Sequence, residues 1–363
     1  MSIISDLMSK ESICIKVPKA HGEKAIALAK ELKILDKELE IQRNTDHIYI
    51  PVIRQPLKSE IDKLREKIPD SRISTYTFPE MRKQTGTFIE LLEKRLSPHL
   101  LASVPRAIDF VGDIAIIEIP PALDADKSTI GEAILKAQKN VHTVLAKASA
   151  IGGTYRTREF SIIAGEPKTE TIHKEYGCKY YVDLAKAYFS PRLSYEHKRI
   201  ASLVEEGETV IDLFAGVGPF SIQIARIHEN VRVYAVDVNP YAVEFLKKNI
   251  RLNRVENKVC PLLGDAKQVV AKRLYEVADR VIMNLPERAI EFVDVACEAL
   301  KPIGGIVHFY SFISSSDLIE NMKRNFVEAV EKHGRKAEKI LFSRLVRATA
   351  PYEWQAVVDA KIH

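Results

Sequence analysis

The chain has 363 residues, enough for two or three domains, and its 54 Lys and Arg against 49 Asp and Glu give a net charge of +5. So small a surplus excludes a uniformly basic surface, and any nucleic-acid-binding surface must be a local patch. The four cysteines are scattered and form no C-x-x-C pair, which argues against structural zinc and a disulfide framework. No apolar run reaches about 18 residues, which argues against a membrane span. We therefore expect a cytoplasmic protein without a metal site.

The first part of the chain predicts a small α+β domain over residues 1–80. Strand patterns occupy residues 13–17, 47–52 and 73–78, and helical patterns occupy residues 22–32 and 57–68. A polar tract with breakers at both ends follows, and we expect residues 81–87 to be a linker.

Residues 88–190 predict a second α+β domain. It begins with a helix to about residue 95, followed by strands at 107–110 and 114–119. The longest helical pattern here covers residues 127–146, with Ile130, Ala133, Ile134, Ala137, Val141, Val144 and Leu145 on one face. Two strands, 169–175 and 178–184, predict a hairpin that turns at Tyr176-Gly177.

From residue 191 to 363, strands alternate with helices, a pattern typical of a parallel sheet. After a helix over residues 195–204, strands are expected at 209–214, 231–236, 259–263, 280–283, 305–310, 338–342 and 354–360. This predicts an α/β fold: a class I (Rossmann-like) methyltransferase domain with a mostly parallel seven-stranded sheet, preceded by the two smaller α+β domains.

The stretch from Thr209 to Phe220 reads as the first strand, turn and helix of that sheet, where such folds bind a nucleotide-like ligand. Gly216 and Gly218 allow positive φ and a close approach of the backbone to a ligand. A third glycine and a lysine are missing, which excludes the dinucleotide and P-loop patterns. Asp212 would repel phosphate, but it suits a cationic group such as the amino group of S-adenosylmethionine.

Polar residues follow the ends of four successive strands, namely Asp212, Asp237, Asp265 and Asn284. Asp237 is placed to accept hydrogen bonds from ribose hydroxyls, although alone it would fit NAD equally well. Asp265 can reach an exocyclic adenine amine. Together the four predict S-adenosylmethionine as the cofactor, and we assign their neighbours Phe214 and Val238 to the same pocket.

Asn284-Leu285-Pro286 lies where amino- and nucleobase-methylating members of this fold have an Asn-Pro-Pro-aromatic loop. An Asn carbonyl or a backbone oxygen there can hold a nitrogen nucleophile in line with the donor, and Pro286 stiffens the loop. Leu285 and Glu287 depart from that pattern, so stacking on the loop is not expected. A plain strand-ending turn is the other interpretation.

A tract just before this domain combines basic and aromatic residues. From Arg156 to Arg199 there are nine Lys and Arg against six Asp and Glu, a composition that suits phosphates and a splayed-out base. With this tract the chain resembles the archaeal and eukaryotic tRNA (guanine-N1)-methyltransferases that modify guanosine 37. The matching stretches are residues 156–159, 164–166, 173–175, 182–183, 188–193, 212–220 and 284–286.

The resemblance implies an S-adenosylmethionine-dependent enzyme whose partner is tRNA rather than DNA, and we expect it to be a monomer. Its first domain would check the outer corner of the tRNA, and the other two would bind the donor and the anticodon stem-loop. Arg156 would polarise guanine O6, where a guanidinium stabilises developing negative charge. Glu196 would accept the weakly acidic N1 proton, and Tyr188 would hold the donor or the base.

Where the family commonly has Arg-Leu-Gly-Trp-Glu-Arg, residues 192–197 read Arg-Leu-Ser-Tyr-Glu-His. The change is either drift at a helix start or the mark of a pocket that accepts a bulkier base. Some archaeal members also methylate C7 of the tricyclic wyosine precursor 4-demethylwyosine (imG-14), so dual activity stays open. An aminocarboxypropyl transferase of wyosine synthesis and a non-catalytic tRNA-binding protein are the alternatives.

Overall fold

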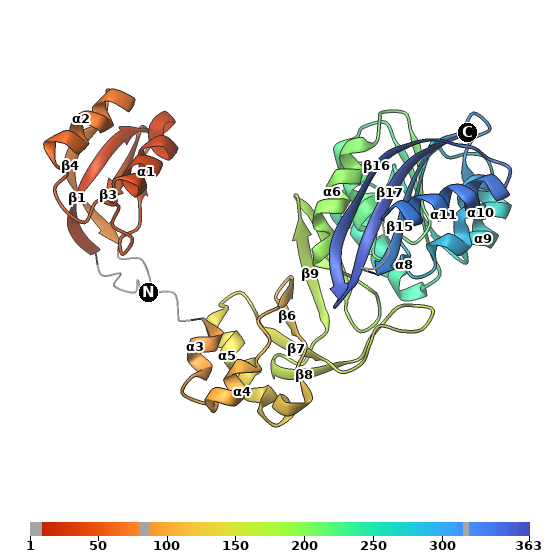
Figure 1. Ribbon diagram of the computed structural model, residues 1–363, viewed down its shortest axis with the longest axis horizontal. Coiled ribbons are helices and arrows are strands. Elements are labelled where there is room, and N and C mark those ends of the chain that lie inside the picture. Colours follow the sequence, from red (N-terminus) through yellow and green to blue (C-terminus); the bar gives the residue numbers. More distant parts are fainter. Residues whose placement is uncertain (1–8, 80–86, 315–318) are drawn as a thin grey trace. The chain divides into compact units, whose positions relative to one another are not determined.

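The computed structural model describes residues 9–79, 87–314 and 319–363 (Figure 1). The chain divides into two compact units, Met1–Thr87 and Phe88–His363. Most of the predicted linker, residues 81–87, lies outside the described residues. Within the described ranges, no helix is long and apolar enough to cross a membrane.

The first unit is a four-stranded antiparallel sheet with two helices. Its strands β1 (Ser9–Pro18), β2 (Gln42–Arg43), β3 (His47–Pro51) and β4 (Arg72–Pro79) lie in the order β2-β3-β1-β4. The helices α1 (Gly22–Glu31) and α2 (Lys58–Lys67) contribute Leu28 and Leu64 to the same core as Ile15 and Ile50 of the sheet. This is the α+β fold that the sequence predicts.

The second unit begins with another four-stranded sheet. The strands β5 (Asp109–Val111), β6 (Ile114–Ile117), β7 (Thr143–Lys147) and β8 (Phe160–Gly165) are adjacent in chain order, and only β6 and β7 are parallel. The helix α5 (Lys127–Ala137) packs against β7 and β8, α3 (Phe88–Leu92) packs against α5, and α4 (Pro98–Ala102) follows α3 (Figure 1).

One predicted helix is wrong in its second half. The helical pattern of residues 127–146 ends with α5 at Ala137, and Val144 and Leu145 belong to strand β7 instead. Thr143, Val144, Leu145 and Ala146 are all buried, so the strand has no alternation of polar and apolar residues. Such an apolar run fits a helical template equally well, which explains the error.

A hairpin joins this sheet to the next one. Its strands β9 (Glu170–Glu175) and β10 (Cys178–Asp183) turn at the predicted position, Tyr176-Gly177. The side chain of Asn249 fixes it to the large sheet's helix layer, because its Oδ1 accepts from Tyr181 N at 2.6 Å and its Nδ2 donates to Tyr181 O at 3.0 Å.

The large sheet has seven strands in the order β13-β12-β11-β14-β15-β17-β16. The five strands β11 (Thr209–Asp212), β12 (Arg232–Asp237), β13 (Val259–Leu263), β14 (Arg280–Met283) and β15 (Gly305–Ser314) are parallel. The strands β16 (Ala337–Ala350) and β17 (Glu353–Ile362) are antiparallel to their neighbours. The predicted class I methyltransferase fold is confirmed.

Helices cover both faces of this sheet. Neighbouring residues such as Val210 and Ile211 point to opposite faces, and each belongs to a different buried core. One core includes residues of α6 (Ser194–Leu203), α7 (Pro219–Ile227) and α8 (Pro240–Asn253), and the other residues of α9 (Ala266–Val269), α10 (Val293–Ala299) and α11 (Ile319–Lys332). Burial on both faces explains the continuous apolar runs of these strands.

The chain order reverses between β11, the middle strand of the parallel part, and its neighbour β14. The residues that follow β11, β12, β13 and β14 therefore gather at one edge, where folds of this type bind their ligands.

Candidate active site

A cavity lies at this edge of the sheet, and it collects most of the residues that the sequence singled out. Nine of them line it: Arg156, Tyr188, Phe214, Gly216, Asp237, Val238, Asp265, Asn284 and Pro286. Three do not, namely Glu196, Asp212 and Gly218.

Asp237 is the most firmly held of the lining acids. Its Oδ2 accepts from Gly216 N at 2.7 Å and its Oδ1 accepts from Asn239 N at 2.8 Å. Burial raises its pKa, and the backbone hydrogen bonds oppose that effect. The carboxylate is thus fixed in place with acceptor capacity left, as recognition of two ribose hydroxyls requires.

Aromatic side chains also line the cavity. Phe214 lines it and packs edge-on against Phe292, with ring centres 5.0 Å apart. Asp265 also serves as a helix cap, since its Oδ1 accepts from Gln268 N at 3.3 Å. An adenine ring with an exocyclic amine suits such a combination of apolar surface and carboxylate.

Asp212 directly precedes the lining residues Leu213 and Phe214 and is fully buried, but it does not itself line the cavity. Ser221 Oγ donates to its Oδ2 at 2.9 Å, whereas Oδ1 has no hydrogen-bond partner. Burial, with a smaller contribution from the charge of Asp237, raises the pKa of Asp212 to about 7. A buried carboxylate with one unpartnered oxygen fits the ammonium group of S-adenosylmethionine, so the residues present are compatible with that cofactor.

The two glycines of the turn have different tasks. Gly216 has φ +55° and lines the cavity, and among the described residues a Cβ there would have Tyr188 O as its one neighbour within 4 Å, at 3.8 Å. Gly218 has φ +92° and is the N-cap residue just before α7, and a Cβ there would overlap Leu246 Cδ1 and lie 3.1 Å from Ile222 Cδ1. The first glycine leaves room for a ligand, and the second leaves room for the core.

We expect Gly218→Ala to lower the free energy of unfolding by roughly 2 to 3 kcal/mol, because it combines backbone strain with overpacking. Gly216→Ala should lower the free energy of unfolding by only about 1 kcal/mol, but it should weaken donor binding more than Gly218→Ala does. Urea unfolding and calorimetric titration of the donor would measure the two effects. Equal losses of stability in the two variants would contradict this division of tasks.

The cavity is also lined by residues assigned to the target base, among them Arg156 and Tyr188. Arg156 adopts a left-handed backbone conformation with φ +53°. Its Nη1 lies 2.5 Å from Glu287 Oε2, and its guanidinium lies 5.7 Å from the centre of the Tyr188 ring. Glu287, which stands where the related loop has an aromatic residue, therefore pairs with Arg156.

Two further lining residues, Arg347 of β16 and Gln355 of β17, were not predicted. Arg347 donates from Nη2 to Tyr188 Oη at 3.1 Å and from Nε to Gln355 Oε1 at 2.8 Å. Gln355 Nε2 in turn donates to Asn284 Oδ1 at 3.0 Å. The side-chain carbonyl of Asn284, which we expected to hold the nucleophile, therefore accepts a hydrogen bond from Gln355.

Glu196 lies in a buried network of charges rather than at the cavity. Its carboxylate accepts hydrogen bonds from Arg199 Nε at 3.0 Å, from Tyr310 Oη at 2.8 Å and from Arg344. Burial and the neighbouring carboxylate raise the pKa of Tyr310, so its hydroxyl remains a donor. The side chain of Glu196 is 1% exposed, and both of its oxygens are engaged.

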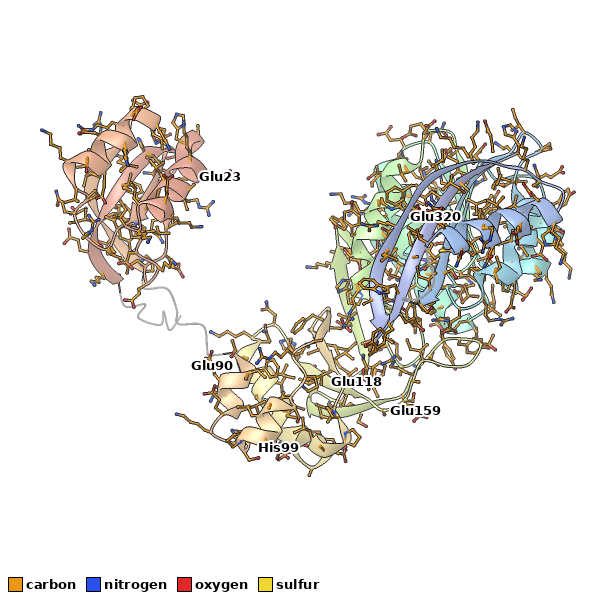
Figure 2. All side chains as sticks on the ribbon, in the orientation of Figure 1. Glu23, Glu90, His99, Glu118, Glu159 and Glu320 are labelled. Atoms are coloured by element: carbon orange, nitrogen blue, oxygen red, sulfur yellow. The ribbon has the colours of Figure 1, made fainter. Side chains whose placement is uncertain are left out.

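A second cavity, of about 400 Å³, adjoins the first and shares Arg156, Tyr188 and Arg347 with it. Its other cationic lining residues are Lys147, Arg158 and Arg192. Lys147 is paired with Glu118, which is labelled in Figure 2, and Arg192 is paired with Asp109. Arg158 makes no ion pair or hydrogen bond with the described residues, and burial lowers its pKa. A half-buried, unpaired guanidinium is suited to an anionic ligand.

Comparison with known proteins identifies the family. A model described as the TRM5/TYW2 methyltransferase domain matches residues 171–339. Models described as the TYW2 N-terminal domain and the tRNA methyltransferase 5 N-terminal domain match residues 88–169 and 14–60.

Two relatives illustrate how much of the chain is shared. The tRNA (guanine(37)-N(1))-methyltransferase Trm5b of Pyrococcus abyssi is 38% identical over 351 residues, 97% of this chain and 99% of that protein. The tRNA 4-demethylwyosine(37)-methyltransferase Taw21 of Saccharolobus solfataricus is 37% identical over 259 residues, 70% of this chain and 94% of that protein.

Solved structures give the same result. A complex of aTrm5 with tRNALeu has a TM-score of 0.67 at 33% identity, over 97% of this chain and all of that chain. The TYW2 of M. jannaschii in complex with AdoMet has a TM-score of 0.55 at 32% identity, over 71% of this chain and 99% of that chain. The chain therefore belongs to the TRM5/TYW2 methyltransferase family and is an S-adenosylmethionine-dependent transferase.

Proposed function

We propose that this protein transfers a methyl group from S-adenosylmethionine to N1 of guanosine 37 in tRNA. One observation carries the proposal: the cavity that holds Asp237 and Asp265 for a donor also holds Arg156, Tyr188 and Asn284 for a base. The near-complete match to Trm5b of Pyrococcus abyssi supports the same substrate.

The chemistry assigns a task to each residue of the site. Bound S-adenosylmethionine supplies an electrophilic methyl group on a sulfonium sulfur. Arg156, which stays charged, stabilises the negative charge that develops on guanine O6 as N1 loses its proton. Pro286 and the bond from Phe312 N to Pro286 O, 3.1 Å long, hold the loop that follows Asn284 in one conformation.

Glu196 is the proposed acceptor of the N1 proton. This assignment comes from the resemblance of residues 188–196 to the family, because the carboxylate does not line the cavity. Arg344, whose side chain is 33% exposed, is the partner that would have to release a Glu196 oxygen for proton transfer.

The partner would be tRNA, with its anticodon stem-loop in the second unit and its outer corner at the first unit. The cationic second cavity beside the base-binding residues supports this for the anticodon loop. We further propose that the protein works as a monomer in the cytoplasm.

A second candidate reaction is methylation of C7 of 4-demethylwyosine at the same position. The similarity to Taw21 favours it, as does the second cavity, which adjoins the base-binding residues and gives room for a tricyclic base. Aminocarboxypropyl transfer is the alternative that the similarity to TYW2 raises.

Mass spectrometry of nucleosides would distinguish these reactions. The protein is incubated with the donor and either unmodified tRNA or tRNA that carries 4-demethylwyosine. We expect a single methyl group on N1 of guanosine 37 with the first substrate. An aminocarboxypropyl adduct, or no product on either substrate, would refute the proposal.

We expect Arg158→Gln to weaken tRNA binding about tenfold at moderate salt and to reduce the slope of log affinity against log salt by about 1. In the wild-type protein, the unpaired guanidinium of Arg158 would contact one phosphate of the tRNA and release the counterion bound there. Arg192 lines the same cavity but is already paired with Asp109, so Arg192→Gln should change the slope less. Filter binding over a range of salt concentrations measures both, and an unchanged slope in Arg158→Gln would argue against a phosphate contact.

A further inference from the structure

We infer that Arg347 and Gln355 are positioning residues that fix the side-chain amide of Asn284 so that it presents an N–H donor, not a carbonyl, to the six-position of the target base. The inference rests on the proposed function. It concerns how the site selects its base, and it assigns a role to two residues outside every motif of the sequence.

The first step is set by arginine, whose side chain only donates hydrogen bonds. Arg347 donates three of them: to Gln355 Oε1 at 2.8 Å, to Ser190 Oγ at 2.9 Å and to Tyr188 Oη at 3.1 Å. Three bonds from one planar group leave the guanidinium a single orientation. Gln355 must therefore turn its oxygen toward Arg347.

The second step follows from the burial of Gln355, which is 1% exposed. If this amide were reversed, its NH₂ group would face the Nε–H of Arg347, and two donors would meet where water cannot separate them. Amide nitrogen and oxygen are assigned from their partners, and here the partner permits only one assignment. Gln355 therefore directs Nε2 toward Asn284.

The third step fixes Asn284 in the same way. Because Gln355 Nε2 is a donor, Asn284 must offer Oδ1, which accepts at 3.0 Å. Asn284 Nδ2 donates to no residue in the part of the chain that the structure describes, and the residue lines the cavity. The free donor is thus available to a ligand in that cavity.

The N–H donor of Asn284 favours a purine that has a hydrogen-bond acceptor at its six-position. Guanine has the carbonyl oxygen O6 there, and its tricyclic wyosine derivative keeps that oxygen. Adenine has an amino group, which would face the Asn284 donor without a partner. The chain from Arg347 to Asn284 therefore favours both substrates considered above and disfavours adenine.

Gln355→Glu is the sharpest test, because a carboxylate only accepts hydrogen bonds. Asn284 would then have to turn Nδ2 toward position 355 and present its oxygen to the base. Two full-length tRNAs are compared, one with guanosine at position 37 and one with 2-aminopurine there, which lacks the oxygen. The ratio of their dissociation constants gives the preference for guanosine. We expect Gln355→Glu to reduce this preference about tenfold or more.

Two further variants separate positioning from a loss of folding. Asn284→Ala should reduce the preference similarly, and adding Gln355→Glu to it should reduce the preference no further, because both act through one group. Gln223→Glu makes the same exchange at an equally buried glutamine of α7 outside the cavity, and it should leave the preference unchanged. The thermal unfolding midpoint and donor affinity are measured for each.

The outcomes are distinct. A wild-type protein that does not methylate guanosine 37 would refute the proposed function. A wild-type protein that methylates it, together with a folded Gln355→Glu variant that keeps the full preference, would overturn the positioning role alone. Additive losses in the double variant would also overturn it.

Discussion

Exchange of Asp212 for Asn is expected to stabilise the protein at pH 8 while it weakens donor binding at least tenfold. The carboxyl group is fully buried, and its pKa is raised to about 7 from the ordinary 3.8. Ionising this group in the folded protein therefore costs about 4 kcal/mol more than ionising it in the unfolded chain. The buried amide of Asn brings its own cost, so we expect a net gain of about 2 kcal/mol.

The pH dependence follows from the sign of this shift. A carboxyl group whose pKa is raised by folding favours the folded state when it is protonated, and that advantage is lost as pH rises through about 7. The Asn variant should therefore gain stability at pH 8 and none near pH 4. The wild-type affinity for the donor should rise between about pH 6 and 7.5, as Asp212 ionises to meet the ammonium group.

Urea unfolding at several pH values and calorimetric titration of the donor measure these two effects. Ser221, Asp237 and the backbone N–H of Phe214 are the polar neighbours that influence the pKa of Asp212. Asp265→Asn serves as the control for the pH dependence, since Asp265 lines the cavity and is not among the groups that shift the pKa of Asp212. An Asp212→Asn variant that is less stable than wild type at pH 8, or that binds the donor normally, would contradict the role of Asp212.

Exchange of Glu196 for Gln is expected to lower turnover on guanosine-37 tRNA by about two orders of magnitude if the residue accepts the N1 proton. It should also destabilise the fold by about 3 kcal/mol, because Arg344 loses the charge that balances it and Arg199 keeps only its pairing with Asp359. Single-turnover rates over a range of pH separate these effects. Loss of a base removes the rising limb of the profile, whereas loss of stability alone keeps its shape.

Arg344→Gln is the control for Glu196. It releases one oxygen of the carboxylate and leaves the bonds from Arg199 and Tyr310 in place. We expect it to keep the rising limb of the pH profile. A Glu196→Gln variant that retains that limb would show that Glu196 organises the network and does not take the proton.

The sequence predicts the parallel sheet well because each strand is a short apolar run that ends in a polar residue. Asp237, Asp265 and Asn284 could be placed at one edge from chain order alone, since the carboxyl ends of parallel strands meet there. The error in residues 127–146 has the opposite cause. Where a strand is buried on both faces, as β7 is, its apolar run does not differ from the face of a helix.

Arg347 and Gln355 could not be found in this way. Arg347 contacts Tyr188, 159 residues earlier in the chain, and Gln355 contacts Asn284, 71 residues earlier. The strand β16 has four register irregularities and extends to Ala350, well beyond the predicted end at residue 342. Bulges disturb the alternation of side chains, so no pattern shows which residues of β16 turn toward the cavity.

The position of β17 between β15 and β16 has a consequence for synthesis of the protein. Domains form in order as the chain leaves the ribosome. The nascent chain acquires Asp237, Asp265 and Asn284 well before Arg347 and Gln355, which wait for the pairing of β16 with β17. The donor-binding residues Asp237, Asp265 and Asn284 are thus all synthesised before the two strands that complete the sheet. Arg347 and Gln355 join Arg156 and Tyr188 beside the target base only at that stage, so an incomplete chain lacks the hydrogen bonds that orient Asn284.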